Sequence, residues 1–355
     1  MKNYIFNKIL STFLIIQVLF VNYISRHPDL VEKYYSNGIY KVISGFFRRL
    51  LGRVPISIGD IFYLILLLLI IRWIWLVIKT RFSPFRKHLY TAGAFISVLL
   101  FAFNMLWGFN YYREPLSKRL GYSNTEYSLK DLKATTDLRI MNLNTIHTSL
   151  TKNDSAVVEI PYKKRAIYKM ARNEYQQLYP DSLDLHFKVK SIKHSLFSVP
   201  ISYMGFSGYL NPFSGEAQVN RKIPLSSYPI TTTHEMAHQL GYASENEANY
   251  IGYLACIHSE NMYFQYSAEL MAVKYLLNEI GKNDPEYYKQ SYKILHFGIQ
   301  KDMQSSHDFW DSFHTPIAPA SKKIYDTYLK VNNQKEGIES YSSFIGYLVN
   351  EKATN

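Results

Sequence analysis

Three long apolar runs in the first third of the chain constrain the fold more than any other feature. They cover about residues 9–25, 61–78 and 89–111, and Arg72 is the only charged residue within them. A helix that crosses a bilayer needs about 20 mostly apolar residues, and a helix in a water-soluble core rarely lacks a polar face over that length. We therefore expect three transmembrane helices in a membrane domain, residues 1–112, with the lipid bilayer as a partner.

The distribution of basic residues predicts the orientation of these helices. The short loop between the second and third runs carries four basic residues between positions 79 and 87. Because short basic loops stay in the cytoplasm, the N-terminus is expected inside and residues 113–355 outside. The first loop is also basic, although this orientation places it outside. Its stretch 40–53 has the amphipathic pattern of a helix that lies on a membrane surface.

Residues 113–355 have a polar, mixed composition without repeats, which is typical of one globular domain. Apolar residues at spacings of three and four predict helices at about 129–150, 162–178, 267–280 and 321–330. Alternation predicts a strand at 186–192. The strand-like segment 215–220 is either an edge strand that pairs with an extended peptide substrate or an ordinary hairpin strand. The domain is thus expected to be α+β, mostly helical, with a small sheet.

Charge and cysteine content exclude several classes of protein. The formal net charge is +12 over 355 residues, but the basic residues flank the apolar runs or are scattered, without a nucleic-acid recognition motif. The single cysteine, Cys256, excludes an internal disulfide framework. We therefore expect no nucleic-acid partner and interpret Cys256 as a core residue. His258, shortly after it, is likewise expected to pack or face solvent rather than bind a metal.

One short segment predicts chemistry. His234 and His238 are four apart, so on a helix their imidazoles lie one turn apart on one face and can hold one metal ion. Glu235 follows the first histidine, where its carboxylate can act as a base on a metal-bound water. This HExxH spacing is typical of zinc metallopeptidases.

Turn and cap residues predict a helix, a sharp turn and a second helix around this motif. The threonines 231–233 are expected to cap the first helix, Gly241 to end it in a left-handed conformation, and Ser244 to cap the second. This arrangement brings the residues just beyond Ser244 back toward the two histidines.

A catalytic zinc needs a third protein ligand, and the candidates are Glu245 and Glu247. Glu245 is favoured because Asn249 lies one turn further along the same face, where a hydrogen bond to a histidine ligand would support the site. Glu247 would point about 200 degrees away around the helix. A group that stabilises an oxyanion is not assigned, since Tyr263, Tyr266, His307 and His314 are all candidates.

The pairing of HExxH with a downstream ExxA and an asparagine resembles the glutamate-ligand zinc peptidases. These include the membrane CAAX-prenyl proteases, the heat-shock membrane proteases and the bacterial peptidases that cleave phage and radiation-response repressors. In those families the first glutamate of ExxA is a metal ligand, which implies that role for Glu245.

Nearly the whole chain is similar to a bacterial membrane family labelled domain of unknown function 3810, which is thought to be a zinc metallopeptidase family. The matching pieces are PISIGDIFY (55–63), WGFNYYREPL (107–116), GYLNPFSGEAQVN (208–220), HEMAHQLGYASENEAN (234–249) and YDTYLKVNNQKEGIESY (325–341). The resemblance implies a multi-pass protein of the bacterial inner membrane with a zincin-like metallopeptidase domain outside the cytoplasm.

We therefore expect a membrane-anchored peptidase that binds Zn²⁺ through His234, His238 and Glu245 and uses Glu235 as its general base. Its partner would be a peptide or protein substrate, which the sequence does not identify, and the oligomeric state is left open. The alternative is a non-catalytic membrane protein whose zinc site is structural or vestigial and which binds a peptide or an envelope component. The intact Glu235 favours the enzyme, because a structural site needs no base beside its first ligand.

Overall fold

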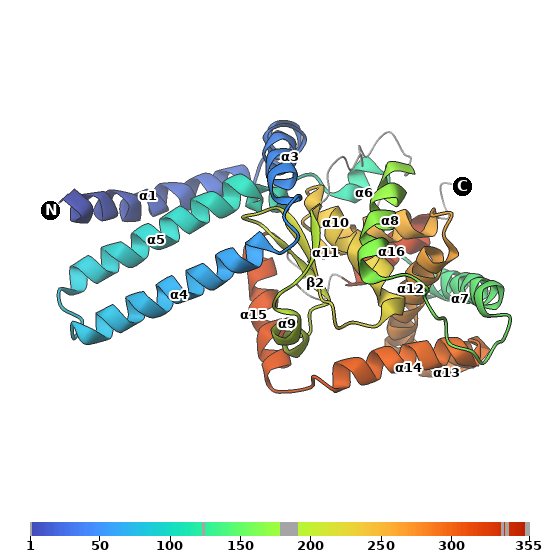
Figure 1. Ribbon diagram of the computed structural model, residues 1–355. Coiled ribbons are helices and arrows are strands. Elements are labelled where there is room, and N and C mark those ends of the chain that lie inside the picture. The colour runs from blue at the N-terminus through green and yellow to red at the C-terminus, as the bar shows by residue number, and fades with distance from the viewer. Residues whose placement is uncertain (1, 123–124, 178–190, 335–336, 338–340, 352–355) are drawn as a thin grey trace.

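The fold is described from a computed structural model, which covers residues 2–122, 125–177, 191–334, 337 and 341–351. It is mostly helical with one small sheet, as the sequence predicts. Three helices extend from one side of a larger globular part (Figure 1).

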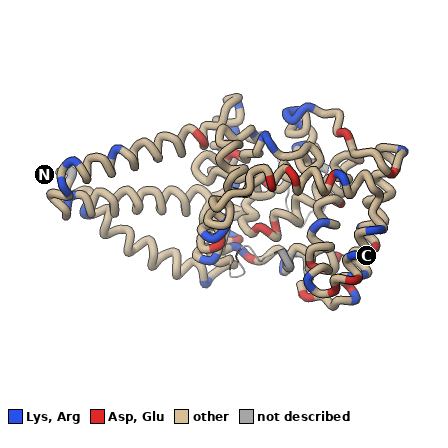
Figure 2. Tube along the Cα trace, turned by 90° about the horizontal axis from the view of Figure 1, so that it is seen from below, with Lys and Arg blue, Asp and Glu red and all other residues tan. Residues whose placement is uncertain are grey.

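The three extended helices are α1 (Lys2–Ile24), α4 (Ile58–Lys79) and α5 (Phe85–Leu106). Each is long and apolar enough to cross a membrane by length and composition. α1 and α5 pack side by side, and the Gln17 amide donates a 2.7 Å hydrogen bond to the Ser97 hydroxyl between them. Lys and Arg gather at the end of these helices that is far from the globular part (Figure 2).

The third helix ends at Leu106, before the predicted limit at residue 111. The chain then turns sharply at Trp107 and forms the short 3₁₀ segment η2 (Gly108–Tyr112), whose residues are all buried. Its aromatic side chains therefore do not sit in a lipid interface. Trp107, Tyr111 and Tyr112 instead pack in a cluster with residues from the first loop and from the globular part.

The first loop is folded. It forms a short helix α2 (Pro28–Leu30), a π-helical segment η1 (Val31–Ile39) and the helix α3 (Tyr40–Leu51). Val31, Tyr35 and Tyr40 of this loop pack in the same cluster as Trp107. The expected boundary at residue 112 therefore falls inside a packed region to which both parts of the chain contribute.

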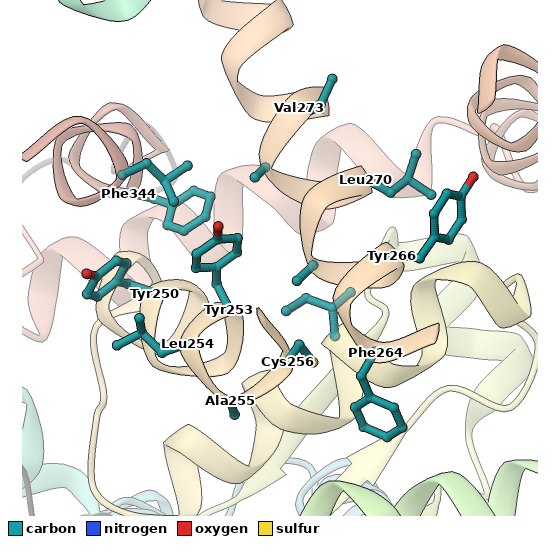
Figure 3. Packing of buried hydrophobic residues seen from close by; sticks show 14 of the residues in the cluster. Tyr250, Tyr253, Leu254, Ala255, Cys256, Phe264, Tyr266, Leu270, Val273 and Phe344 are labelled. Atoms are coloured by element: carbon teal, nitrogen blue, oxygen red, sulfur yellow. The ribbon is translucent and has the colours of Figure 1, made fainter. Parts of the chain in front are cut away.

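The globular part is built mainly from helices. They are α6 (Leu116–Arg119), α7 (Leu129–Thr151), α8 (Lys164–Gln177), α9 (Ser198–Met204), α10 (Tyr228–Gln239), α11 (Glu245–Ile257), α12 (Met262–Asn283), α13 (Pro285–Ile294), α14 (Phe297–Asp311), α15 (Ile317–Val331) and α16 (Tyr341–Asn350). α7, α8, α12 and α15 confirm the four predicted helices. α11 and α12 form the centre of the main core, and Cys256 lies there among Tyr253 and Phe264 (Figure 3).

The sheet has three strands in the order β1-β3-β2, with β1 (Ile192–His194), β2 (Gly208–Asn211) and β3 (Glu216–Val219). β3 pairs with β1 in parallel and with β2 antiparallel. The segment 215–220 therefore contains the central strand and pairs with β2 as a hairpin. Of the two alternatives, the hairpin strand is confirmed and the edge strand was wrong. β2 is an edge strand instead. The predicted strand at 186–192 lies almost entirely outside the described residues.

Polar contacts join the sheet to the start of α4. Glu216 is fully buried and accepts a 2.6 Å hydrogen bond from the backbone N–H of Gly59. Lys193 pairs with Glu216 and donates to the carbonyls of Leu51 and Ile56 at 2.9 and 2.8 Å. Because a buried ion pair is costly to separate, these contacts hold the chain before α4 against the sheet.

Candidate metal centre

α10 and α11 form the expected helix, turn and helix. Gly241 has φ = +88°, the left-handed conformation that favours glycine, and it ends α10. The predicted cap was wrong, because α10 begins at Tyr228 and has Pro229 in its first turn. The threonines 231–233 lie inside the helix, where the Thr233 hydroxyl donates to the backbone of the preceding turn. Ser244 precedes α11, but its side chain makes no capping hydrogen bond.

Three side chains of these helices converge on one point. The Nε2 atoms of His234 and His238 lie 3.1 Å apart. The two carboxylate oxygens of Glu245 lie 3.4 Å from His234 Nε2 and 3.6 Å from His238 Nε2. Two ligand atoms held at about 2.0 to 2.1 Å from a tetrahedral zinc are about 3.3 to 3.4 Å apart. The spacing of the three donors therefore fits one zinc ion.

The imidazole of His238 is oriented for metal binding. Its Nδ1 atom lies 2.7 Å from the carbonyl oxygen of Tyr242. Burial lowers the pKa of His238 to about 4, so the ring is neutral near pH 7 and Nδ1–H donates to that carbonyl. The lone pair is then on Nε2, which faces His234 and Glu245. A histidine ligand is commonly oriented in this way by a backbone carbonyl.

Glu245 is held in its charged form. Burial by itself would raise its pKa, but the hydrogen bonds with His234 and Tyr325 and the charge of His234, whose own pKa is raised, outweigh burial and lower the pKa of Glu245. The hydroxyl of Tyr325, on α15, donates a 2.5 Å hydrogen bond to Glu245 Oε1. Tyr325 was not among the sequence candidates. It lies in a segment that carries the family resemblance, which was the only signal for it.

The pKa of His234 is affected by its acidic neighbours Glu245 and Glu235. Burial disfavours its charged form, but the hydrogen bond with Glu245 and the charge of Glu235 raise its pKa. Asn249 lies close enough to act in the same direction on this pKa, although His234 Nδ1 has no hydrogen-bond partner among the described residues. Asn249 therefore lies next to a histidine of the cluster, where the sequence places it.

Glu235 lies beside this cluster, against the edge strand. A Cβ atom at Gly208 would lie 2.5 Å from Glu235 Oε1, so glycine is needed there for the close approach of β2. Oε2 is buried and has no hydrogen-bond partner among the described residues. Burial raises the pKa of Glu235 to about 8. An apolar environment that raises a carboxyl pKa toward 7 is typical of catalytic acids and bases.

The other residues that were considered as metal ligands lie away from the cluster. Glu247 accepts a 2.7 Å hydrogen bond from the backbone N–H of Leu116 and is not within ion-pair distance of either histidine. Cys256 is fully buried and its sulfur lies 3.2 Å from the Thr233 hydroxyl, as a core residue. His258 bonds to a carbonyl of its own helix.

Residues from the membrane side of the molecule cap the C-terminal end of α10. The last carbonyls of a helix have no partner within it. Tyr40 donates to the carbonyl of Gln239 at 3.0 Å, and Trp107 donates to the carbonyl of His238 at 3.3 Å. Arg113 donates to the carbonyl of Gly241 at 3.0 Å. We refer to Tyr40, Trp107 and Arg113 as the α10 cap, which no pattern in the sequence indicates.

A cavity of about 630 Å³ opens onto the cluster. His234, Glu235, His238 and Glu245 line it, together with strand residues 208–210. Aromatic residues from the membrane side and from α15 complete the wall: Tyr63, Trp107, Tyr111, Tyr325 and Tyr328. None of the four sequence candidates for oxyanion stabilisation is among these described lining residues. Tyr266, for example, donates to Asp302 instead.

A search of curated proteins and a search of solved structures each gave no match. The family described as "Protein of unknown function (DUF3810)" matches residues 35–349. The match begins within the folded first loop and continues through the cluster to the last described helix. The chain therefore belongs to the DUF3810 family, as the motifs suggested.

Proposed function

We propose that this protein is a membrane-anchored zinc metallopeptidase with a zincin-like catalytic domain. The observation that supports this most directly is the convergence of His234, His238 and Glu245 at distances suited to one zinc ion, with a buried carboxyl group beside them. The metal would be Zn²⁺ because two imidazoles and one carboxylate are a common donor set for catalytic zinc.

Zinc bound to these ligands would polarise a substrate carbonyl and lower the pKa of a bound water. The protein's own contribution is to place a base next to that water. Glu235 Oε2 is buried, lines the cavity and has no competing partner among the described residues. It would take the proton of the attacking water and pass it to the leaving amine, as a general base and then a general acid.

The edge strand β2 favours a peptide as the substrate. Its residues 208–210 line the cavity beside Glu235, and within the described sheet β2 pairs with β3 on one side only. An extended peptide that added a strand along the other side would have its backbone held next to the cluster. We therefore propose β2, rather than the segment 215–220, as the strand that binds the substrate.

The charge distribution supports a domain outside the cytoplasm. The basic residues Lys79, Arg81, Arg86 and Lys87 lie in and beside the short loop between α4 and α5. This loop is at the end of the membrane helices that is far from the globular part (Figure 2). By the positive-inside rule this end is cytoplasmic. The protein would then be a multi-pass protein of the bacterial inner membrane with its site on the outer side.

Two substitutions separate this proposal from a structural zinc site. In the full-length protein, purified in detergent, Glu235→Gln should keep about one zinc per chain and lose all peptide cleavage, since base and ligand are separate groups. His234→Ala should lose both. Zinc is counted by elemental mass spectrometry, and cleavage of a peptide library is followed by mass spectrometry.

The matched controls are Glu279→Gln, near the end of α12, where the carboxylate pairs with Lys282, and His296→Ala. His296 lies in a second histidine pair, 3.2 Å from His147 Nδ1, and this variant shows how much zinc that pair takes up. Wild-type protein without zinc, or with zinc that His234→Ala does not remove, would exclude the proposed site. Zinc that depends on His234 but gives no cleavage would favour the non-catalytic alternative.

A further inference from the structure

α15 carries an apolar stripe on its outer face. The stripe consists of Ile317, Ala320, Ile324 and Val331, which recur at helical spacing and are all exposed. Ile324 and Val331 are 71% and 74% exposed. Large apolar side chains on a helix of a soluble domain normally face its core, so an exposed row of them indicates a contact that the protein makes with something else.

α3 carries a second stripe of the same kind. Ile39, at its start, and Val42, Phe46 and Leu50 follow one another at spacings of three and four, and all are exposed. Figure 1 shows α3 and α15 on opposite sides of the membrane helices, at the end nearest the globular part, and each runs across the direction of those helices. Both helices would therefore lie parallel to a bilayer that contains α1, α4 and α5.

The charges beside the stripes suit a lipid surface. Arg49 and Arg53 are exposed at the end of α3, and Lys323 is exposed on α15, whereas Lys322 lines the cavity. The α3 segment itself contains no acidic residue. Helices that lie in a membrane surface combine an apolar face with such basic flanks, and these attract anionic headgroups.

We propose that α3 and α15 are seated in the surface of the bilayer that α1, α4 and α5 cross, with the two stripes in contact with anionic phospholipid. The two faces of α15 then have different partners. The outer face contacts lipid, while Tyr325, about 100 degrees around the helix from Ile324, bonds to Glu245. The wall of the cavity is thereby attached to the membrane surface. This proposal depends on neither zinc nor catalysis.

The test uses variants of the full chain that each carry one added cysteine, in vesicles of mixed zwitterionic and anionic phospholipid. Val42→Cys and Ile324→Cys are labelled with an environment-sensitive fluorophore. Met141→Cys, which is 58% exposed on α7 far from the membrane helices, is the matched control. Wild-type protein is the labelling blank, because its Cys256 is fully buried.

Labels at positions 42 and 324 should be quenched by lipids that carry a quencher near the headgroup, at a depth of about 5–10 Å. They should be protected from iodide in the water. The label at position 141 should instead be quenched by iodide and not by the lipid quencher. Iodide quenching at 324 equal to that at 141 would overturn the proposal. Protection from iodide without quenching by lipid would also overturn it, since a second copy of the chain would then cover the stripe.

Discussion

The α10 cap gives the most direct test of how the membrane side supports the site. Tyr40 is 2% exposed, and its hydroxyl donates to the carbonyl of Gln239, which is 1% exposed. Tyr40→Phe removes the donor and leaves this carbonyl buried without it. An unsatisfied buried polar group costs about 1–3 kcal/mol. At roughly 2–4 °C per kcal/mol for a domain of 150–250 residues, the melting temperature should fall by about 2–12 °C.

The chain supplies its own reporter for this measurement. Cys256 is the only cysteine, is fully buried in α11, and has a pKa raised by burial, so its thiol is unreactive in the folded protein. A dye that fluoresces on reaction with thiols therefore reports unfolding around α10 and α11 during a thermal ramp in detergent. Tyr34→Phe, at a position that is 58% exposed, is the matched control and should not change the transition. If Tyr40→Phe has the same melting temperature as this control, the α10 cap does not stabilise the site.

Three further substitutions or fusions test the site and its orientation. Gly208→Ala would place a Cβ 2.5 Å from Glu235 Oε1. It should abolish peptide cleavage while about one zinc per chain remains bound. If zinc is also lost, Gly208 does not act through the base Glu235 alone. Tyr325→Phe removes the hydrogen bond to Glu245 and should weaken zinc affinity about 10–100-fold, measured by competition with a chelator; unchanged affinity would refute the positioning role. A reporter enzyme that folds only outside the cytoplasm, fused after Asn355, should be active, and inactivity with an active cytoplasmic reporter would reverse the orientation.

The local part of the site could be predicted because helix geometry determines it. His234 and His238 fall on one face through their spacing, and the left-handed residue Gly241 reverses the chain. Spacing favoured Glu245 over Glu247 through Asn249, but it did not decide the choice, because the rotation of α11 depends on the turn before it. Tyr325 was missed because it lies 80 residues beyond Glu245 and reaches the site only through tertiary packing.

The C-terminal end of the third membrane helix was predicted at residue 111 instead of Leu106 for a different reason. Trp107 and the residues up to 112 continue the apolar run, and hydropathy does not distinguish lipid from protein interior as the apolar surroundings. The central position of β3 was missed because a strand of four residues has too short a pattern to separate an edge from a centre. All four of its residues are buried, including Glu216 and Gln218.

The α10 cap also determines what happens if the chain is cut. A fragment that begins at Arg113 retains every residue of the HExxH segment but loses Tyr40 and Trp107. With them it loses the donor to the Gln239 carbonyl and one of the two donors to the His238 carbonyl, which also accepts from the backbone N–H of Gly241. We expect this fragment to bind zinc poorly or to unfold, which its metal content would show. Cutting the globular part from the apolar helices would then weaken the proposed metal site and would not release it intact.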